Sequence, residues 1–214
     1  MNIESKIEQA KLTIALDVRH PFAFLALGPA IDFGDAHEIT INWLPRASET
    51  LRPPTPVGRD DDRSVRHNRY RAQMVSREIA VYADAQGLQL EQPYRSDPAD
   101  LAHMAWLYIR ETVPDALEPF LVELFRRYWS LCLNANDPDE TSKLVVEFGG
   151  DGQEFLAWAA SSGPLAIEHV ATSLEEVGLF GVPAYLACGQ VFQGRQHLPM
   201  IEWLLAAESG PIPI

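Results

Sequence analysis

The chain has 214 residues, of which 47% are hydrophobic and 22% are charged. This composition is typical of a globular protein and excludes a disordered tail or an isolated coiled coil. Thirty acidic residues against 17 basic ones give a formal net charge of −13, which disfavours nucleic-acid binding because a phosphate backbone requires a cationic face.

The sequence contains no pattern typical of a membrane segment or of a metal site. Residues 1–18 carry scattered charges and lack the continuous apolar stretch of a signal peptide, and no run of about 18 apolar residues occurs elsewhere. We therefore expect a cytoplasmic protein without a membrane partner. Cys132 and Cys188 form neither a C-x-x-C pair nor a metal-ligand cluster, so we expect two buried, unreactive thiols and no metal site.

The N-terminal part of the chain predicts a strand, a helix and a second strand. Apolar and polar residues alternate over residues 12–18 and 39–43, which is typical of strands. Between them His20 precedes Pro21 and a helix-compatible apolar run, and proline is favoured at the first helical position. A strand, helix and strand in this order predict a parallel βαβ unit.

Regular structure is expected to stop after Trp43. Four prolines occur between residues 45 and 56, which indicates a linker or a loop over a site. Residues 63–177 then show almost continuous helical periodicity, with a stop at Gly87 and a break at Pro114. One cluster of cations lies beside three aspartates and predicts a solvated helix face rather than an anion site; it consists of Arg63, Arg66, Arg69 and Arg71.

The C-terminal segment returns to strands. Residues 184–187 and 191–192 flank the turn signal Cys188 and Gly189, which predicts a β-hairpin, and an amphipathic helix over residues 200–205 closes the chain. The order of elements predicts an α/β, thioredoxin-like fold. Residues 10–62 and 178–210 form its discontinuous sheet domain, and residues 63–177 form an inserted all-helical domain.

Three segments resemble one known family. Residues 17–25 read D-V-R-H-P-F-A-F-L, similar to the D-x-x-S-P-(Y/F)-(S/A)-(Y/F/W)-L signature of 2-hydroxychromene-2-carboxylate isomerases and kappa-class glutathione transferases, which belong to the wider DsbA-like family. Residues 178–184 and 192–198 resemble that family's G-x-(F/V)-G-V-P-(T/S) strand and its F-x-G-x-(D/Q)-R-L turn. Residues 82–88 resemble its helix ending in A-x-x-x-G-L, and all matches occur in the family's order.

The resemblance implies glutathione as cofactor, a small-molecule substrate and a homodimer. In that family a serine at the start of the first helix hydrogen-bonds the thiol of glutathione, and DsbA-like oxidoreductases carry C-x-x-C at the same turn. This sequence has His20 in that place. It also departs from the family near the end, where Gln196 and His197 replace an acid–arginine pair, and in the long helix, where Glu78 and Val81 replace D-x-x-R.

His20 is the candidate catalytic residue. A neutral imidazole at a helix N-terminus can hydrogen-bond a thiolate or move a proton. In the alternative interpretation it caps the helix, or packs against the proline-rich loop of a site that has lost its chemistry. Both interpretations remain open at this point.

The ligand-binding candidates lie mainly in the turns at the sheet edge. The resemblance implies that the backbone of Val182, before Pro183, pairs with the peptide-like backbone of a ligand, whereas the alternative is an ordinary strand residue; we expect the Val182–Pro183 bond to be cis. Arg195 and Gln196 are candidates for a ligand carboxylate, or else face solvent. The remaining candidates are Arg19, Phe22 and Trp43, the last of which also fits the core.

Two functions follow. The first is a glutathione- or thiol-dependent isomerase, transferase or oxidoreductase acting on a small apolar substrate. The second is a catalytically inactive DsbA-like binding module that has lost the serine or cysteine of the active-site turn. An oxidoreductase with its own dithiol ranks third, because residues 19–24 contain no cysteine.

Overall fold

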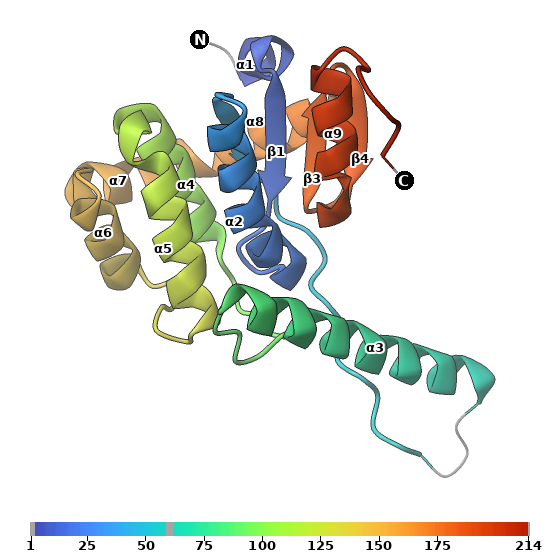
Figure 1. Ribbon diagram of the computed structural model, residues 1–214. Helices are drawn as coiled ribbons and strands as arrows, with labels where there is room; N and C mark the ends of the chain where they lie inside the picture. Colours follow the sequence, from blue (N-terminus) through green and yellow to red (C-terminus); the bar gives the residue numbers. More distant parts are fainter. Residues whose placement is uncertain (1–2, 59–61, 214) are drawn as a thin grey trace.

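The computed structural model describes residues 3–58 and 62–213, and its centre is a four-stranded mixed sheet (Figure 1). The strand order is β2 (Ile41–Pro45), β1 (Leu12–Leu16), β3 (Ala184–Ala187) and β4 (Gln190–Gln193). Strand β1 runs parallel to β2 and antiparallel to β3, and β4 is antiparallel to β3. The sheet is built from both ends of the chain, and the predicted α/β, thioredoxin-like fold class is confirmed.

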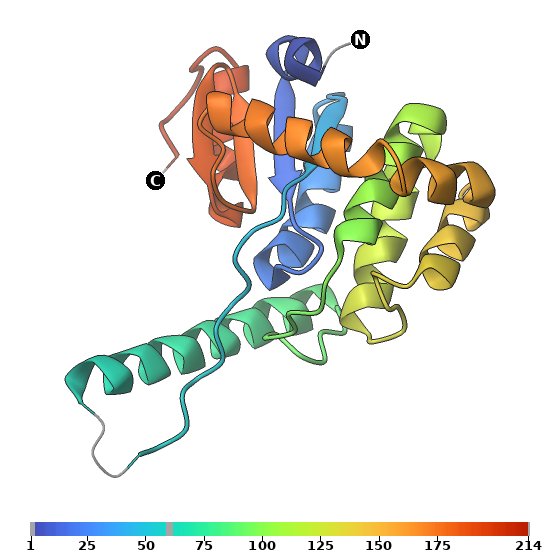
Figure 2. The same ribbon diagram turned by 180° about the vertical axis from the view of Figure 1, so that it is seen from behind.

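Helices cover both faces of the sheet. Helices α2 (Pro21–Ala36) and α9 (Leu198–Leu205) lie on one face, and α8 (Gly163–Glu176) crosses the other (Figures 1 and 2). Alternate strand residues point to opposite faces, so Ala15, Leu44 and Ala184 pack with α8, whereas Ile14, Trp43 and Tyr185 belong to the larger core cluster. Helix α8 packs on the sheet, although the predicted domain division places it in the insert.

Local residues mark the ends of several helices. Asp62, Asp137 and Asp151 each accept a hydrogen bond from a backbone amide of the helix that they precede. Gly87 ends α3 with a φ of 64°. Helix α1, before the first strand, was not predicted. The remaining helices are α1 (Ile3–Gln9), α3 (Arg63–Gln86), α4 (Asp100–Thr112), α5 (Leu117–Trp129), α6 (Pro138–Glu147), α7 (Gly152–Ala159) and the 3-10 turns η1 (Pro114–Ala116) and η2 (Arg195–His197).

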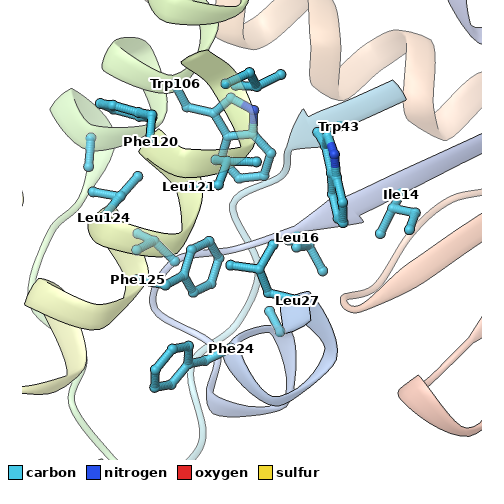
Figure 3. Close-up of a cluster of buried hydrophobic side chains, with 14 of the residues drawn as sticks. Ile14, Leu16, Phe24, Leu27, Trp43, Trp106, Phe120, Leu121, Leu124 and Phe125 are labelled. Atoms are coloured by element: carbon cyan, nitrogen blue, oxygen red, sulfur yellow. The ribbon is translucent and has the colours of Figure 1, made fainter. Parts of the chain in front are cut away.

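One hydrophobic core joins the sheet to the helical segment. Side chains of β1, β2 and α2 interdigitate with those of α4 and α5 (Figure 3). The largest of them, Trp43, Trp106 and Trp129, are all at most 1% exposed. The helical segment therefore packs against the sheet domain through a continuous apolar interior.

Helix α3 projects from the rest of the molecule. The segment over residues 46–58 runs beside it (Figures 1 and 2). Arg69 is buried and donates to the carbonyl oxygens of Thr55 (2.7 Å) and Pro56 (2.8 Å). This corrects the prediction that the whole arginine cluster is solvated, since Arg69 attaches the proline-rich segment to the helix. The other three cluster members, Arg63, Arg66 and Arg71, are exposed.

Both cysteines are exposed, which contradicts the predicted burial. Cys188 and Gly189 form the two-residue loop of the β3–β4 hairpin, with φ values of 51° and 72°. Such a loop places its first side chain outside the sheet. Cys132 follows α5, after Leu131 at a φ of 59°. None of the helices in the described residues is long and apolar enough to cross a membrane.

Candidate functional site

His20 occupies the N-cap position of α2. The turn after β1 is closed by a hydrogen bond from the His20 amide to the Asp17 carbonyl (3.0 Å), and His20 has extended backbone angles of −103° and 117°. Pro21 follows at the first helical position. The predicted placement at the helix start is confirmed. The His20 side chain makes no capping hydrogen bond, so capping does not explain this histidine.

The imidazole of His20 is held in its neutral form. Burial lowers its pKa below the usual value; the Asp17 carboxylate opposes this shift, and Arg19 adds to it. The Nδ1 atom is buried and has no hydrogen-bond partner among the described residues. The ring centroid of Phe22 lies 5.9 Å away. An unpaired buried nitrogen is unusual, and it leaves His20 with hydrogen-bonding capacity for a ligand.

The first turn of α2 has one free amide. Pro21 has no N–H group, and the amides of Ala23 and Phe24 both donate to the His20 carbonyl, at 2.9 and 3.3 Å. In the described part of the chain, the Phe22 amide makes no such backbone bond. A free amide at a helix N-terminus favours a negatively charged group.

The segment before β3 supplies the second side of the site. The Val182–Pro183 bond is cis, as predicted. Strand β1 is antiparallel to β3 with Ala15 opposite Ala184, so the end of β1 and the entry into β3 share one sheet edge. The Pro183 carbonyl accepts from the Gly194 amide at 2.8 Å. The Val182 amide and carbonyl make no backbone hydrogen bond to any described residue, which leaves a short strand edge open.

A buried carboxylate lies under the turn. Asp17 is fully buried and accepts from Arg19 Nη2 (2.8 Å), the Ser48 amide (2.7 Å) and Ser48 Oγ (3.0 Å). His103 Nε2 lies 3.2 Å from its other oxygen. Burial alone would raise the pKa of Asp17, but the contacts with His103 and Arg19 outweigh it and hold that pKa far below its usual range.

Two residues are held in place by this network, and a ligand-binding role for Arg19 stays a prediction. Arg19, predicted to bind ligand, forms the ion pair with Asp17 and also donates to the Ser48 carbonyl (3.0 Å). Asp17 is fully engaged by these partners and by His103. The network ties the end of β1 to the loop after β2 and to helix α4.

Arg46 was missed by the sequence reasoning. Its backbone amide donates to the Leu16 carbonyl (2.8 Å), and its side chain donates to the carbonyls of Phe180 (3.2 Å) and Ala171 (3.2 Å) and to Glu175 (3.0 Å). It thereby holds the segment that leads to Val182. The available signal was its place directly after the second strand, at the same sheet edge as the turn after the first. Ser48 and His103 were also missed, and no spacing in the sequence links them to Asp17.

The other predicted ligand residues lie elsewhere or are engaged. Trp43 is buried in the core and donates from Nε1 to Glu118 (2.9 Å). The guanidinium carbon of Arg195 lies 3.1 Å from the ring centroid of Tyr82. Gln196 is exposed and contacts its neighbour in η2, and η2 itself packs beside α2. A binding role for these three residues stays a prediction.

A large cavity lies away from this site. It has a volume of about 930 Å³ and is lined by residues at the opposite end of the parallel strands, including Lys11, Asn42, Trp43 and Arg110. Neither His20 nor Val182 lines it. Across the described residues, no group of three or more His, Cys, Asp or Glu is placed to hold a metal ion.

A helix that starts directly after the first strand, at the sheet edge where a cis-proline precedes an antiparallel strand, defines a thioredoxin-fold protein. The family model for the DSBA-like thioredoxin domain matches residues 37–206. The chain belongs to this family.

Several solved structures share the fold. A 2-hydroxychromene-2-carboxylate isomerase is 12% identical with a TM-score of 0.71, and the match covers 92% of this chain and 95% of that one. A "probable DsbA oxidoreductase" from Streptomyces coelicolor is 18% identical with a TM-score of 0.70, over 96% and 93%. The cytosolic disulfide reductase DsbM from Pseudomonas aeruginosa, solved with GSH, is 13% identical with a TM-score of 0.61, over 92% and 97%. No curated protein matches the sequence.

Proposed function

We propose that this protein binds glutathione or a related thiol at the His20 turn and uses it to isomerise, conjugate or reduce a small apolar substrate in the cytoplasm. One observation carries the proposal. Three polar groups at one sheet edge, the His20 Nδ1 atom, the Phe22 amide and the Val182 backbone, have no hydrogen-bond partner among the described residues and suit a peptide that bears a thiolate.

The Val182 backbone suits the peptide part of the ligand. An extended peptide can add to an open strand edge through its main-chain groups, and Val182 offers one amide and one carbonyl. Support comes from DsbM, a structural neighbour that was solved with GSH.

The N-terminus of α2 is suited to bind the sulfur atom of glutathione. When bound, glutathione supplies a nucleophilic thiol. The Phe22 amide and the positive end of the helix favour its thiolate form. His20 is neutral and pairs with no carboxylate of the described residues, because Asp17 is engaged by Arg19, Ser48 and His103. It therefore acts as a single imidazole that holds or moves one proton at the sulfur.

Apolar side chains near Val182 and His20 favour an apolar substrate. Phe180 is 67% exposed, although its carbonyl is fixed by Arg46. Phe22 is half-buried beside the His20 ring. An exposed aromatic side chain two residues before Val182 and a half-buried one beside His20 favour an apolar or aromatic substrate.

The second candidate is a binding module without catalysis. It is favoured by the same isolation of His20, since a histidine without a carboxylate partner has little driving force as a general base. In this case the thiol still binds and no turnover occurs. A dithiol mechanism of the chain itself is disfavoured, because Cys132 follows α5 and Cys188 lies at the hairpin tip.

Calorimetric titration with reduced glutathione tests the proposal. We expect binding, together with a rise in the melting temperature that grows with ligand concentration. His20→Ala should weaken binding and lower the thiolate absorbance of the bound ligand at neutral pH, whereas Leu165→Ala, a 69% exposed residue on α8, should change neither.

Two results would decide against parts of the proposal. Absence of binding overturns the thiol site altogether. Binding that persists in His20→Ala with unchanged thiolate fraction, together with no turnover of chromene or disulfide substrates by the parent chain, establishes the binding module instead.

A further inference from the structure

Another cavity lies among helices on the face of the sheet that α8 covers. It has a volume of about 630 Å³ and is lined by residues of α1, α4, α7 and α8. Helices α4, α7 and α8 pack against one another, and Figure 2 shows α8 passing in front of α4 toward α7. Neither His20 nor Val182 lines this cavity. It is therefore separate from the site at the start of α2, and its volume is typical of a small-molecule site.

The inner part of the cavity is apolar and aromatic. Leu107 and Tyr108 of α4 are buried there, and Trp158 of α7 and Ala166 of α8 are half-buried. The ring centroids of Tyr108 and Trp158 lie 6.1 Å apart, with an angle of 45° between the ring planes. These two rings form an aromatic wall. A concave surface of this kind suits a small apolar ligand.

The lining of the cavity is acidic. Among the described residues it includes Glu111, Glu154 and His169, and no lysine or arginine. The Glu111 carboxylate is paired with Lys6 Nζ (2.7 Å) and with Arg110. Glu154 forms no ion pair with any described residue. An unpaired carboxylate at the edge of an apolar cavity favours a cationic ligand over a neutral or anionic one.

Glu154 lies directly beside the aromatic wall. It precedes Trp158 by four residues on α7, and residues at this spacing share one face of a helix. The Tyr108 hydroxyl donates to Glu154 Oε2 at 3.3 Å, whereas Oε1 accepts from no described residue. Burial raises the pKa of the Tyr108 hydroxyl, and the Glu154 carboxylate raises it further. A cation in this place therefore meets a carboxylate oxygen and two aromatic rings, both of which attract positive charge.

We propose that this cavity binds a small hydrophobic amine in its protonated form, with the apolar body of the ligand against Trp158 and Tyr108 and its ammonium group at Glu154. The ammonium donates to Glu154 Oε1. The formal net charge of −13 also attracts a cation at long range. This second ligand site does not rest on the thiol chemistry proposed for His20.

Calorimetric titration with three probes of the same shape tests the charge of the ligand. Phenylbutylamine is a cation at neutral pH, phenylbutanol is neutral, and phenylbutyrate is an anion. We expect the amine to bind about threefold to tenfold more tightly than the alcohol, because the carboxylate of the site is partly solvated. Phenylbutyrate should bind more weakly than both.

Variants of the full chain locate the site. Glu154→Gln keeps the shape of the side chain and should abolish the preference for the amine over the alcohol. Glu176→Gln, the same change at an exposed residue of α8 outside the lining, should keep it. Trp158→Ala should weaken the binding of all three probes, and circular dichroism checks that each variant keeps the parent helix content.

Three results would overturn the proposal. The first is an absence of phenylbutylamine binding, and the second is equal affinity for the amine and for phenylbutyrate. The third is amine binding that survives both Glu154→Gln and Trp158→Ala unchanged, because the ligand must then lie elsewhere. His20→Ala should leave amine binding unaltered, so that the outcome is independent of whether glutathione binds.

Discussion

Asp17 is the residue on which the geometry of the site depends. Its carboxylate is fully buried, and an ionised carboxylate in the interior is stable only when it is paired and hydrogen-bonded. The partners of Asp17 are Arg19 in the turn after β1, Ser48 in the loop after β2 and His103 in helix α4. Replacing the carboxylate by an amide would remove the charge that pairs with Arg19 and turn one of the two acceptor oxygens into an NH2 donor.

Asp17→Asn should therefore destabilise the protein by about 3–5 kcal/mol at pH 7. The pKa of Asp17 is lowered by folding from an ordinary value of 3.8. A carboxyl with a lowered pKa contributes stability above its unfolded pKa, and this contribution is lost as the pH falls toward the folded pKa. The difference in unfolding free energy between parent and variant should be full above about pH 5 and shrink below pH 4.

Urea unfolding at a series of pH values measures this difference. Asp35→Asn is the matched control, because Asp35 is exposed, and its effect should stay within about 0.5 kcal/mol. A gap between parent and Asp17→Asn that is constant from pH 3 to pH 7 would show that the carboxylate charge is not what stabilises the turn.

At the scale of single elements, substitutions in the β3–β4 hairpin test its two-residue loop directly. Cys188 has a φ of 51° although it is not glycine, and asparagine tolerates this conformation better than cysteine in a two-residue loop. Cys188→Asn should raise the unfolding free energy by about 0.5 kcal/mol, whereas Cys188→Val should lower it. Thermal unfolding monitored by circular dichroism checks both. Equal stability of the two variants would contradict the assigned loop.

The segment before β3 depends on Arg46. Arg46→Met keeps the length of the side chain but removes its hydrogen bonds to Phe180, Ala171 and Glu175. We expect a loss of about 1–3 kcal/mol of stability and faster amide hydrogen exchange around Val182. The control is Glu175→Gln, which alters only the exposed partner and should cost less than about 1 kcal/mol. Unchanged exchange in Arg46→Met would show that the segment is held by other contacts.

Local chemistry made some elements predictable from the sequence. Asp137 and Asp151 mark helix starts, and Gly87 marks a helix end, because capping and left-handed turns require these residue types nearby. The position of His20 followed in the same way from Pro21. These features depend on neighbours within a few residues.

Features set by distant neighbours were not predictable. Arg69 resembles its exposed neighbours in sequence, but it is buried by carbonyls of the loop that precedes it. Ser48 and His103 meet Asp17 only in the folded chain. The exposure of both cysteines follows from their turns, since a small apolar residue at a loop tip has no core to enter.

At the scale of the whole molecule, the sheet and the helical segment share their interior. Trp43 of β2 and Phe24 of α2 lie in one cluster with Trp106 and Phe125 of the helical segment (Figure 3). Helix α8 covers the second face of the sheet. The predicted insert is thus joined to the sheet on two sides.

Replacing residues 63–177 by a short linker should therefore unfold the remainder, because it exposes both sheet faces in part. We expect no cooperative thermal transition and no near-ultraviolet circular dichroism signal in the shortened chain, where the full chain shows both. A shortened chain that melts cooperatively near the parent temperature would establish two independent domains.

The Asp17–Arg19 ion pair also has a consequence for how fast a ligand arrives. The pair is neutral as a unit, and Arg195 is likewise close to Glu78, so the site adds no attractive field of its own. The formal charge of −13 then dominates at long range. Under the proposed function, anionic glutathione approaches against this repulsion, and screening shortens the range of the repulsion to about 8 Å at physiological ionic strength. Association should therefore become faster as salt is added, the reverse of electrostatic steering.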